Sequence, residues 1–141
     1  MKPRIGIIDG QGGGIGAAIV KMLKQTFGET VELIALGTNA IAVAQMIRAG
    51  GNRGAYGENA ICRTVGQVDC IIGAISITWP NAMLGEVTPP IAEALTSCSA
   101  EKILIPLHQE KAVVVGLPDE PLPHLIQIAV ENHIRETINH V

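Results

Sequence analysis

Aromatic residues and clustered positive charge are scarce in this 141-residue sequence. Phe27, Tyr56 and Trp79 are its only aromatic residues, and the formal net charge is −3 at pH 7. Proteins that bind nucleic acids neutralise phosphates with clustered Lys and Arg, and those that bind single strands also stack bases on aromatic side chains. We therefore expect no nucleic-acid partner.

Charged residues are also few. They make up 16% of the chain, whereas 48% of the residues are apolar, and an average globular protein has about 25% charged residues. This composition excludes a disordered chain, and the length fits one domain with a single core, residues 1–141. The low charge predicts that apolar surface is buried in two ways, on both faces of a parallel sheet and in a homo-oligomer.

Cysteine motifs and long apolar runs are absent as well. Cys62, Cys70 and Cys98 are odd in number and have no C-x-x-C spacing, and no His, Cys, Asp and Glu cluster has zinc spacing. We expect buried free thiols and no metal. No apolar run reaches the length of a membrane span, and no signal-peptide pattern precedes the first strand, so we expect a cytoplasmic protein without a membrane partner.

The sequence does contain a regular alternation of strand and helix patterns. Short, continuously apolar runs predict strands over 4–9, 31–36, 53–56, 68–75 and 102–107. Helical periodicity predicts helices over 15–27 and 122–138, and three further helices between the strands. Of the three further helices, the first has Thr38 or Asn39 as its cap, and the second begins near Glu58. The third has Thr88 as its cap and Pro89 in its first turn.

Strands of this kind are typical of a parallel sheet that is covered on both faces, and right-handed crossovers give a strand order such as 3-2-1-4-5. The apolar residues 112–115 follow a tight return at 108–110, which predicts an antiparallel strand beside 102–107. The expected fold class is therefore α/β: a three-layer, Rossmann-like domain with a mostly parallel sheet and an antiparallel C-terminal edge hairpin.

The first predicted strand runs directly into a glycine-rich turn. Glycines permit a sharp strand-to-helix turn and close approach of a pyrophosphate, and the helix that follows offers unpaired N–H groups and its positive dipole end. The turn is predicted to bind a small anionic ligand, above all a nucleotide such as NAD(P); the alternative is a purely structural turn. The predicted binding residues of the turn are Gly10, Gly12, Gly13, Gly14 and Gly16.

The spacing of these glycines restricts the kind of turn. Two alanines follow Gly16 where a triphosphate-binding loop needs Lys and Ser or Thr. The pattern G-x-x-x-G-x-G, through Gly10, Gly14 and Gly16, resembles the cofactor turn of the short-chain dehydrogenases/reductases, over residues 1–37. The catalytic Tyr-x-x-x-Lys of that family is absent, because Ala60 stands four residues after Tyr56. The resemblance therefore implies a cofactor turn without reductase chemistry.

The end of the second predicted strand lacks the acid that usually binds the ribose of a dinucleotide. Thr38 and Asn39 stand in its place. Either they bind a ribose or a phosphate, or they cap the helix that follows. A bound nucleotide would then be held differently from NAD in ordinary dinucleotide folds.

A second resemblance covers nearly the whole chain. It rests on the sequences DGQGGGIG, ALGTNA, GENA, LGEVTP and ILIP, at residues 9–16, 35–40, 57–60, 84–89 and 103–106. These segments resemble a family of short bacterial proteins of unknown function. The resemblance implies the same fold and a bacterial cytoplasmic setting, and it implies no particular activity.

Three side chains are candidates for acid–base chemistry at the carboxyl ends of the strands, where open parallel sheets bind ligands. Asp9 either acts as a base or accepts backbone hydrogen bonds that fix the turn. Glu58 either acts as a base or begins a helix, and His108 is either a general acid–base group or an exposed hairpin residue. Glu86 lies in a long loop, 76–88, of the kind that covers ligands.

Three functions remain open on this basis. The first is a binding module for a nucleotide or phosphorylated metabolite. The second is a small enzyme that acts on such a metabolite through Asp9, Glu58 or His108. The third is an oligomeric adaptor whose glycine turn is structural. An acidic pocket with perturbed carboxylates favours the enzyme, and a wide crevice at the glycine turn that holds a phosphate favours binding.

Overall fold

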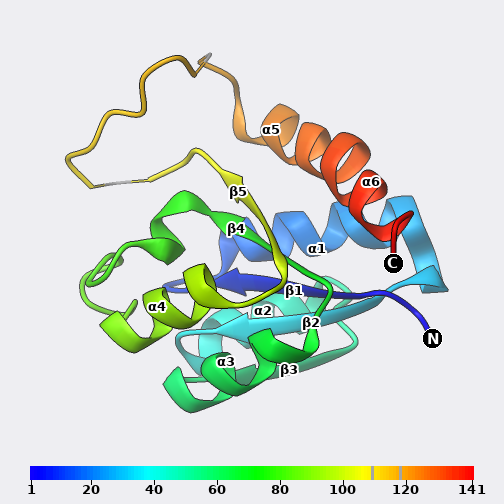
Figure 1. Ribbon diagram of the computed structural model, residues 1–141, viewed down its shortest axis with the longest axis horizontal. Helices are drawn as coiled ribbons and strands as arrows, with labels where there is room; N and C mark the ends of the chain where they lie inside the picture. The colour runs from blue at the N-terminus through cyan, green and yellow to red at the C-terminus, as the bar shows by residue number, and fades with distance from the viewer. Residues whose placement is uncertain (109, 118) are drawn as a thin grey trace.

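A computed structural model describes residues 1–108, 110–117 and 119–141 (Figure 1). Its centre is a sheet of five strands, all parallel, in the order β3-β2-β1-β4-β5. The strands are β1 (Arg4–Asp9), β2 (Glu32–Gly37), β3 (Arg53–Tyr56), β4 (Cys70–Ala74) and β5 (Glu101–Ile105). The predicted strand order 3-2-1-4-5 is confirmed.

Helices connect these strands. They are α1 (Gly14–Phe27), α2 (Ala40–Arg48), α3 (Glu58–Thr64) and α4 (Pro89–Ser97), with short 3-10 segments at Gly28–Thr30, Val65–Gln67 and Ile75–Thr78. The C-terminal helix consists of α5 (Leu122–Ile128), a π-helical segment (Ala129–Ile134) and α6 (Arg135–Ile138). None of the helices in the described ranges is long and apolar enough to cross a membrane.

The helix ends follow from local side-chain chemistry. The Oδ1 atom of Asn39 accepts a hydrogen bond from a backbone amide in the first turn of α2, at 2.9 Å. The hydroxyl of Thr88 accepts one in the same way at the start of α4, at 3.4 Å, and Pro89 is the first residue of that helix. Gly28 ends α1 with a φ of 57°. These are the predicted caps and ends.

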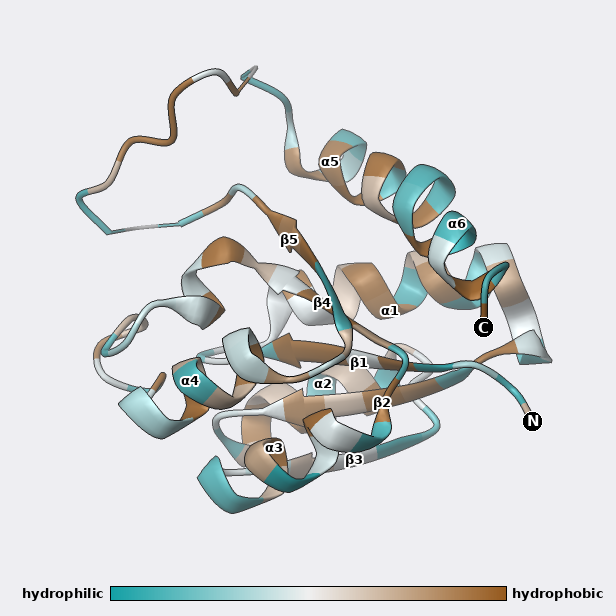
Figure 2. Cartoon of the chain, in the orientation of Figure 1, coloured by the Kyte–Doolittle hydropathy of each residue, from teal (hydrophilic) through white to brown (hydrophobic). Residues whose placement is uncertain are grey.

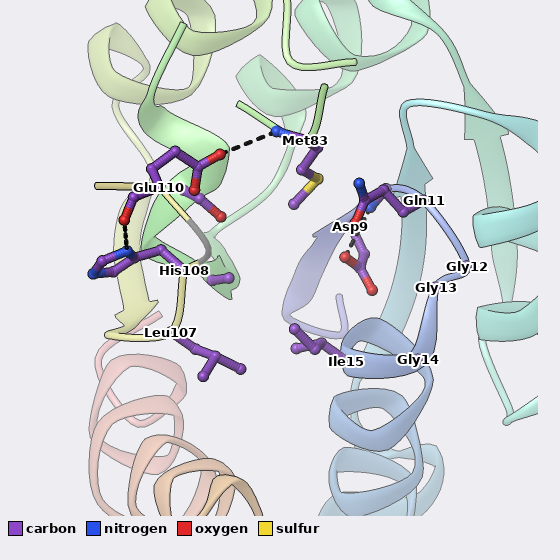
Figure 3. Close-up of a pocket in the computed structure, with 13 residues that line it drawn as sticks. Asp9, Gln11, Gly12, Gly13, Gly14, Ile15, Met83, Leu107, His108 and Glu110 are labelled. Atoms are coloured by element: carbon purple, nitrogen blue, oxygen red, sulfur yellow. Dashed lines mark hydrogen bonds between the residues drawn. The ribbon is translucent and has the colours of Figure 1, made fainter. Parts of the chain in front are cut away.

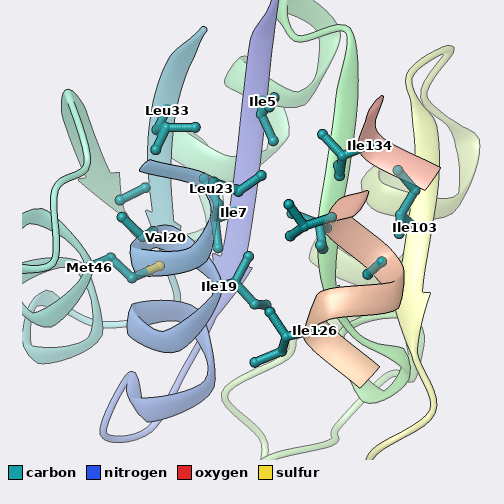
Figure 4. Close-up of a cluster of buried hydrophobic side chains, with 14 of the residues drawn as sticks. Ile5, Ile7, Ile19, Val20, Leu23, Leu33, Met46, Ile103, Ile126 and Ile134 are labelled. Carbon is teal, nitrogen blue, oxygen red and sulfur yellow. The ribbon is translucent and has the colours of Figure 1, made fainter. Parts of the chain in front are cut away.

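Successive residues of the strands enter two separate apolar clusters. Ile5, Ile7 and Leu33 pack with α1, α2 and the C-terminal helix (Figure 4), whereas Ile8 and Leu36 pack with α3 and α4. All five side chains are at most 2% exposed, and each such burial contributes about 2 kcal/mol. Burial on both faces explains why the three central strands, β2, β1 and β4, are almost continuously apolar, as Figure 2 shows for β1.

The order in which successive strands are added to the sheet reverses between β1 and β4. Strands β2 and β3 extend the sheet on one side of β1, and β4 and β5 extend it on the other. The register places Asp9, the last residue of β1, beside Gly37 at the end of β2. Ligands of open parallel sheets bind beyond the carboxyl ends of the strands at such a switch point.

The expected antiparallel strand over 112–115 is not present. After Ile105 the described residues contain no strand, and Val113 and Val115 are 89% and 90% exposed. Pro106 follows β5 directly and has no N–H to donate to a hairpin ladder. Residue 109 of the expected return lies outside the described residues. The described residues between β5 and α5 instead extend away from the rest of the domain (Figure 1).

Candidate functional site

A cavity of about 290 Å³ lies at the switch point (Figure 3). Small-molecule sites start at about 300 Å³, so the cavity has room for a compact ligand. Its lining comes from the glycine turn, the end of β4, the loop before α4 and the segment after β5: Asp9, Gly10, Gln11, Gly12, Gly13, Gly14, Ile15, Ala74, Ser76, Met83, Leu107, His108 and Glu110.

The five glycines of the turn divide into two groups. Gly13 has a φ of 75°, and a Cβ there would lie 2.7 Å from a Cα atom of α2. A Cβ on Gly10 or Gly16 would also meet an atom at 2.6 Å. At Gly12 and Gly14, by contrast, a Cβ would meet nothing within 4 Å. Three glycines therefore serve close packing, whereas the other two have free space at the Cβ position.

The turn presents backbone donors to the cavity. Across the described residues, the amides of Gly12, Gly14 and Ile15 donate no hydrogen bond to the protein, and all three residues line the cavity. Gly14 and Ile15 belong to the first turn of α1, where N–H groups are unpaired and the helix dipole is positive. These three amides are the groups in the site that best fit an anion.

The Asp9 carboxylate is used by the turn itself. One of its oxygens accepts a hydrogen bond from the Gly10 amide at 2.8 Å, and the other accepts one from the Gly16 amide at 2.7 Å. Burial raises the pKa of Asp9 above its ordinary value, although these two hydrogen bonds lower it in part and the charge of Glu86 raises it further. Asp9 thus fixes the turn, while it also lines the cavity.

Thr38 and Asn39 contact Glu86 and do not line the cavity. One Glu86 oxygen, Oε1, accepts hydrogen bonds from the Thr38 hydroxyl at 2.6 Å and from the Asn39 amide group at 2.8 Å. It also accepts one from the Gln11 backbone amide at 2.8 Å. Partial burial raises the pKa of Glu86, but these hydrogen bonds outweigh it and leave the pKa below its ordinary value. A protein carboxylate thus occupies the donors for which a nucleotide contact was predicted.

Glu86→Gln is expected to lower the free energy of unfolding by about 1 kcal/mol at pH 7, because the three hydrogen bonds lose the charge of their acceptor. A lowered native pKa stabilises the fold above the ordinary glutamate pKa of about 4.3, and this contribution is lost as the pH falls through the native pKa. The difference from wild type should therefore shrink below about pH 4.3. Urea denaturation at several pH values from 7 to 3.5 measures this difference in the free energy of unfolding. The control is Glu93→Gln, because Glu93 lies on the exposed face of α4. A difference that does not change with pH would contradict this account.

Glu58 lies outside the cavity. It is the first residue of α3, and its carboxylate accepts a hydrogen bond from the Thr88 hydroxyl at 2.6 Å. This contact ties the start of α3 to the cap of α4. The structure therefore does not bring Glu58 together with the other two acid–base candidates.

His108 lines the cavity through the segment after β5. Its Nδ1 lies 3.1 Å from the Glu110 carbonyl oxygen, which can only accept, so Nδ1 carries a proton. The ring packs against Trp79 at a centroid distance of 4.8 Å. In Figure 3 the ring is directed away from the Asp9 carboxylate, so the two do not form an acid–base pair.

Glu110 is a cavity residue that was not predicted from the sequence. Its carboxylate accepts a hydrogen bond from the Met83 amide at 3.2 Å, which joins the segment after β5 to the loop before α4. Its position just beyond the carboxyl end of a predicted strand is the feature of the sequence that could have identified it as a site residue. Among the described residues, no Lys or Arg lines the cavity, and no group of three or more His, Cys, Asp and Glu could hold a metal ion.

Comparison with known proteins identifies the family of the chain. Residues 4–138 match the model of the family described as Domain of unknown function (DUF3842). The chain therefore belongs to this family. The comparisons with curated proteins and with solved structures found no match.

Proposed function

From the family match, which carries no activity, and the site described above, we propose that this protein binds a compact phosphorylated metabolite, such as a mononucleotide. In this proposal the domain is a three-layer Rossmann-like module, and the ligand occupies the cavity beside the glycine turn. Its phosphate accepts hydrogen bonds from the amides of Gly12, Gly14 and Ile15. Binding is its function, without catalysis.

The position of the cavity carries this proposal. Its lining comes from the carboxyl ends of β1, β4 and β5, at the point where the strand order reverses. Crevices at this point of parallel α/β sheets are their usual ligand sites. Three unpaired amides of the described chain line the same space, and a helix N-terminus favours an anion there.

The charge of the lining restricts the ligand. Asp9 and Glu110 are carboxylic acids, and no Lys or Arg of the described residues lines the cavity. Several phosphates would have no counter-charge and would be repelled by these groups. A ligand with one phosphate and with hydroxyl or amino donors suits the site better, because such donors can bind the carboxylate oxygens.

A ligand of this class is expected to raise the melting temperature. At a hundred times its dissociation constant it adds about 2.7 kcal/mol to the free energy of unfolding, or roughly 8 °C for a domain of this size. Differential scanning fluorimetry against AMP, other mononucleotides, sugar phosphates, NAD, NADP, FAD, FMN, CoA and S-adenosylmethionine measures this effect. A panel that produces no rise would contradict the proposal.

Gly14→Val is the matching variant. A Cβ at Gly14 meets no protein atom within 4 Å, and Gly14 lines the cavity in which the proposal places the ligand. A valine there should therefore lower the affinity by at least about tenfold with little loss of stability. Gly66→Val is the control, because Gly66 has the same free space and lies outside the cavity. Equal binding by both variants would place the ligand elsewhere.

The pKa of Asp9 favours a second candidate function, that of a small enzyme. A buried carboxyl group with a raised pKa is a frequent acid–base group, and Asp9 shares the cavity with His108 and Glu110. Incubation of a stabilising ligand with the protein, followed by phosphorus NMR, separates the two functions. A converted ligand would indicate the enzyme, and an unchanged ligand supports binding alone.

Self-association and a cytoplasmic location also belong to the proposal. The low charge content supports a homo-oligomer, and the exposed Val113 and Val115 provide apolar surface for it.

A further inference from the structure

Residues 79–88 form the loop between the 3-10 segment after β4 and helix α4. Backbone hydrogen bonds within this loop make it compact. The Asn81 amide donates to the Val87 carbonyl at 2.6 Å, and the Val87 amide donates to the Ala82 carbonyl at 3.1 Å. Ala82 and Val87 are only 2% and 1% exposed, because they enter the core cluster of α3 and α4. The loop is therefore anchored in the core and holds its side chains in fixed places.

Two side chains of this loop fill the space over Gly10. From the position of a Cβ on Gly10, the Met83 sulfur lies at 2.7 Å and the Glu86 Oε1 atom at 3.2 Å, with the Thr38 hydroxyl at 2.6 Å. The same Glu86 oxygen accepts the hydrogen bonds from Gln11, Thr38 and Asn39 described above. These three donors, which follow β1 and β2, thus have an acceptor within the protein.

A dinucleotide needs both sides of the glycine turn. In parallel sheets with this strand order its pyrophosphate crosses the turn, and one ribose lies at the end of β2. Here the β4 side of the turn is an open cavity of about 290 Å³, and Met83 forms part of its lining. On the β2 side, Met83 and Glu86 fill the space beside Gly10 and Thr38.

We propose that Met83 and Glu86 make the crevice selective, so that it accepts compact ligands with one phosphate and excludes dinucleotides. This inference rests on the proposed function, since it concerns which ligand the same site takes. Met83 excludes the ligand by occupying the space, and the Glu86 carboxylate repels a second phosphate. Selectivity of this kind combines a steric block with an unfavourable charge.

Calorimetric titration of AMP and of NAD into three proteins tests this inference: the wild type, the double variant Met83→Ala/Glu86→Ala and Leu84→Ala. Leu84 lies in the same loop and is 97% exposed, so its variant is the matched control. We expect wild type and Leu84→Ala to bind NAD at least about tenfold more weakly than AMP. In the double variant, we expect the ratio of NAD affinity to AMP affinity to rise by about tenfold. The single variant Met83→Ala, which keeps the three hydrogen bonds of Glu86, should show part of this rise if the double variant is unfolded.

Two results would overturn the inference: wild type binding NAD as well as AMP, or folded variants in which the ratio of NAD affinity to AMP affinity does not rise. If neither probe binds any of the proteins and the full ligand panel raises no melting temperature, the proposed function fails, and amide hydrogen exchange without ligand separates that failure from a misplaced loop. The Gln11 amide should exchange slowly in wild type and faster in Glu86→Ala, because only wild type retains its acceptor. Equal exchange would show that Glu86 does not cover the β2 side and would overturn the inference on its own.

Discussion

Gly13→Ala is expected to lower the free energy of unfolding by about 3 kcal/mol. Gly13 has a φ of 75°, which side chains rarely adopt, and its Cβ would lie 2.7 Å from the Ala42 Cα and 2.8 Å from the Ala42 oxygen. Both are backbone atoms of α2 and cannot rotate away, so either α2 or the glycine turn must shift. Urea denaturation with a common m-value measures the loss.

The matched control lies one residue further along the chain. Gly14 has free space for a Cβ and helical backbone, so Gly14→Ala should stay within about 0.5 kcal/mol of wild type. A Gly13→Ala protein as stable as Gly14→Ala would mean that the turn does not approach α2 as closely as described.

Asp9→Ala is expected to cost about 3 kcal/mol at pH 7, because it leaves the buried amides of Gly10 and Gly16 without their acceptors. Asp9 is 4% exposed, so water replaces the carboxylate poorly. The control is Asp69→Ala. Asp69 accepts one backbone hydrogen bond, from Arg4 at 2.7 Å, at a half-buried position, and its loss should cost about 1 kcal/mol. Equal losses for the two variants would contradict the described role of Asp9.

The pH dependence of the Asp9 variant has a definite sign. Its raised pKa means that the native state holds the proton more tightly than the unfolded chain. This contribution to stability is complete below the ordinary aspartate pKa of about 3.9 and is lost as the pH rises through the raised native value. The difference between wild type and Asp9→Ala should therefore be larger near pH 4 than at pH 7. Denaturation at both pH values checks the sign.

Two carboxylates, those of Asp9 and Glu86, determine the geometry of the turn, and only the first of these roles could be predicted from the sequence. Asp9 follows a strand and precedes glycines, so its role in fixing the turn could be predicted from neighbouring residues alone. Glu86 is 75 positions from Gln11, and its place at the end of β2 depends on the packing of Ala82 and Val87 in the core. No local pattern encodes that contact. The roles of the individual glycines were likewise decided by what approaches them, which is α2 at Gly13 and open space at Gly14.

The sequence by itself determined the five strands of the parallel sheet, the cap of α4, the strand order and the location of the glycine turn, because each depends on periodicity, capping chemistry and the handedness of crossovers within short segments. The sequence left the cap of α2 open between Thr38 and Asn39, and the structure shows that it is Asn39. The tertiary structure alone decided that residues 112–115 leave the sheet, that Glu58 lies outside the cavity, and that Glu110 lines it while Glu86 takes the donors of Thr38 and Asn39. These contacts join residues far apart in the chain, and which of them form depends on the packing of the core.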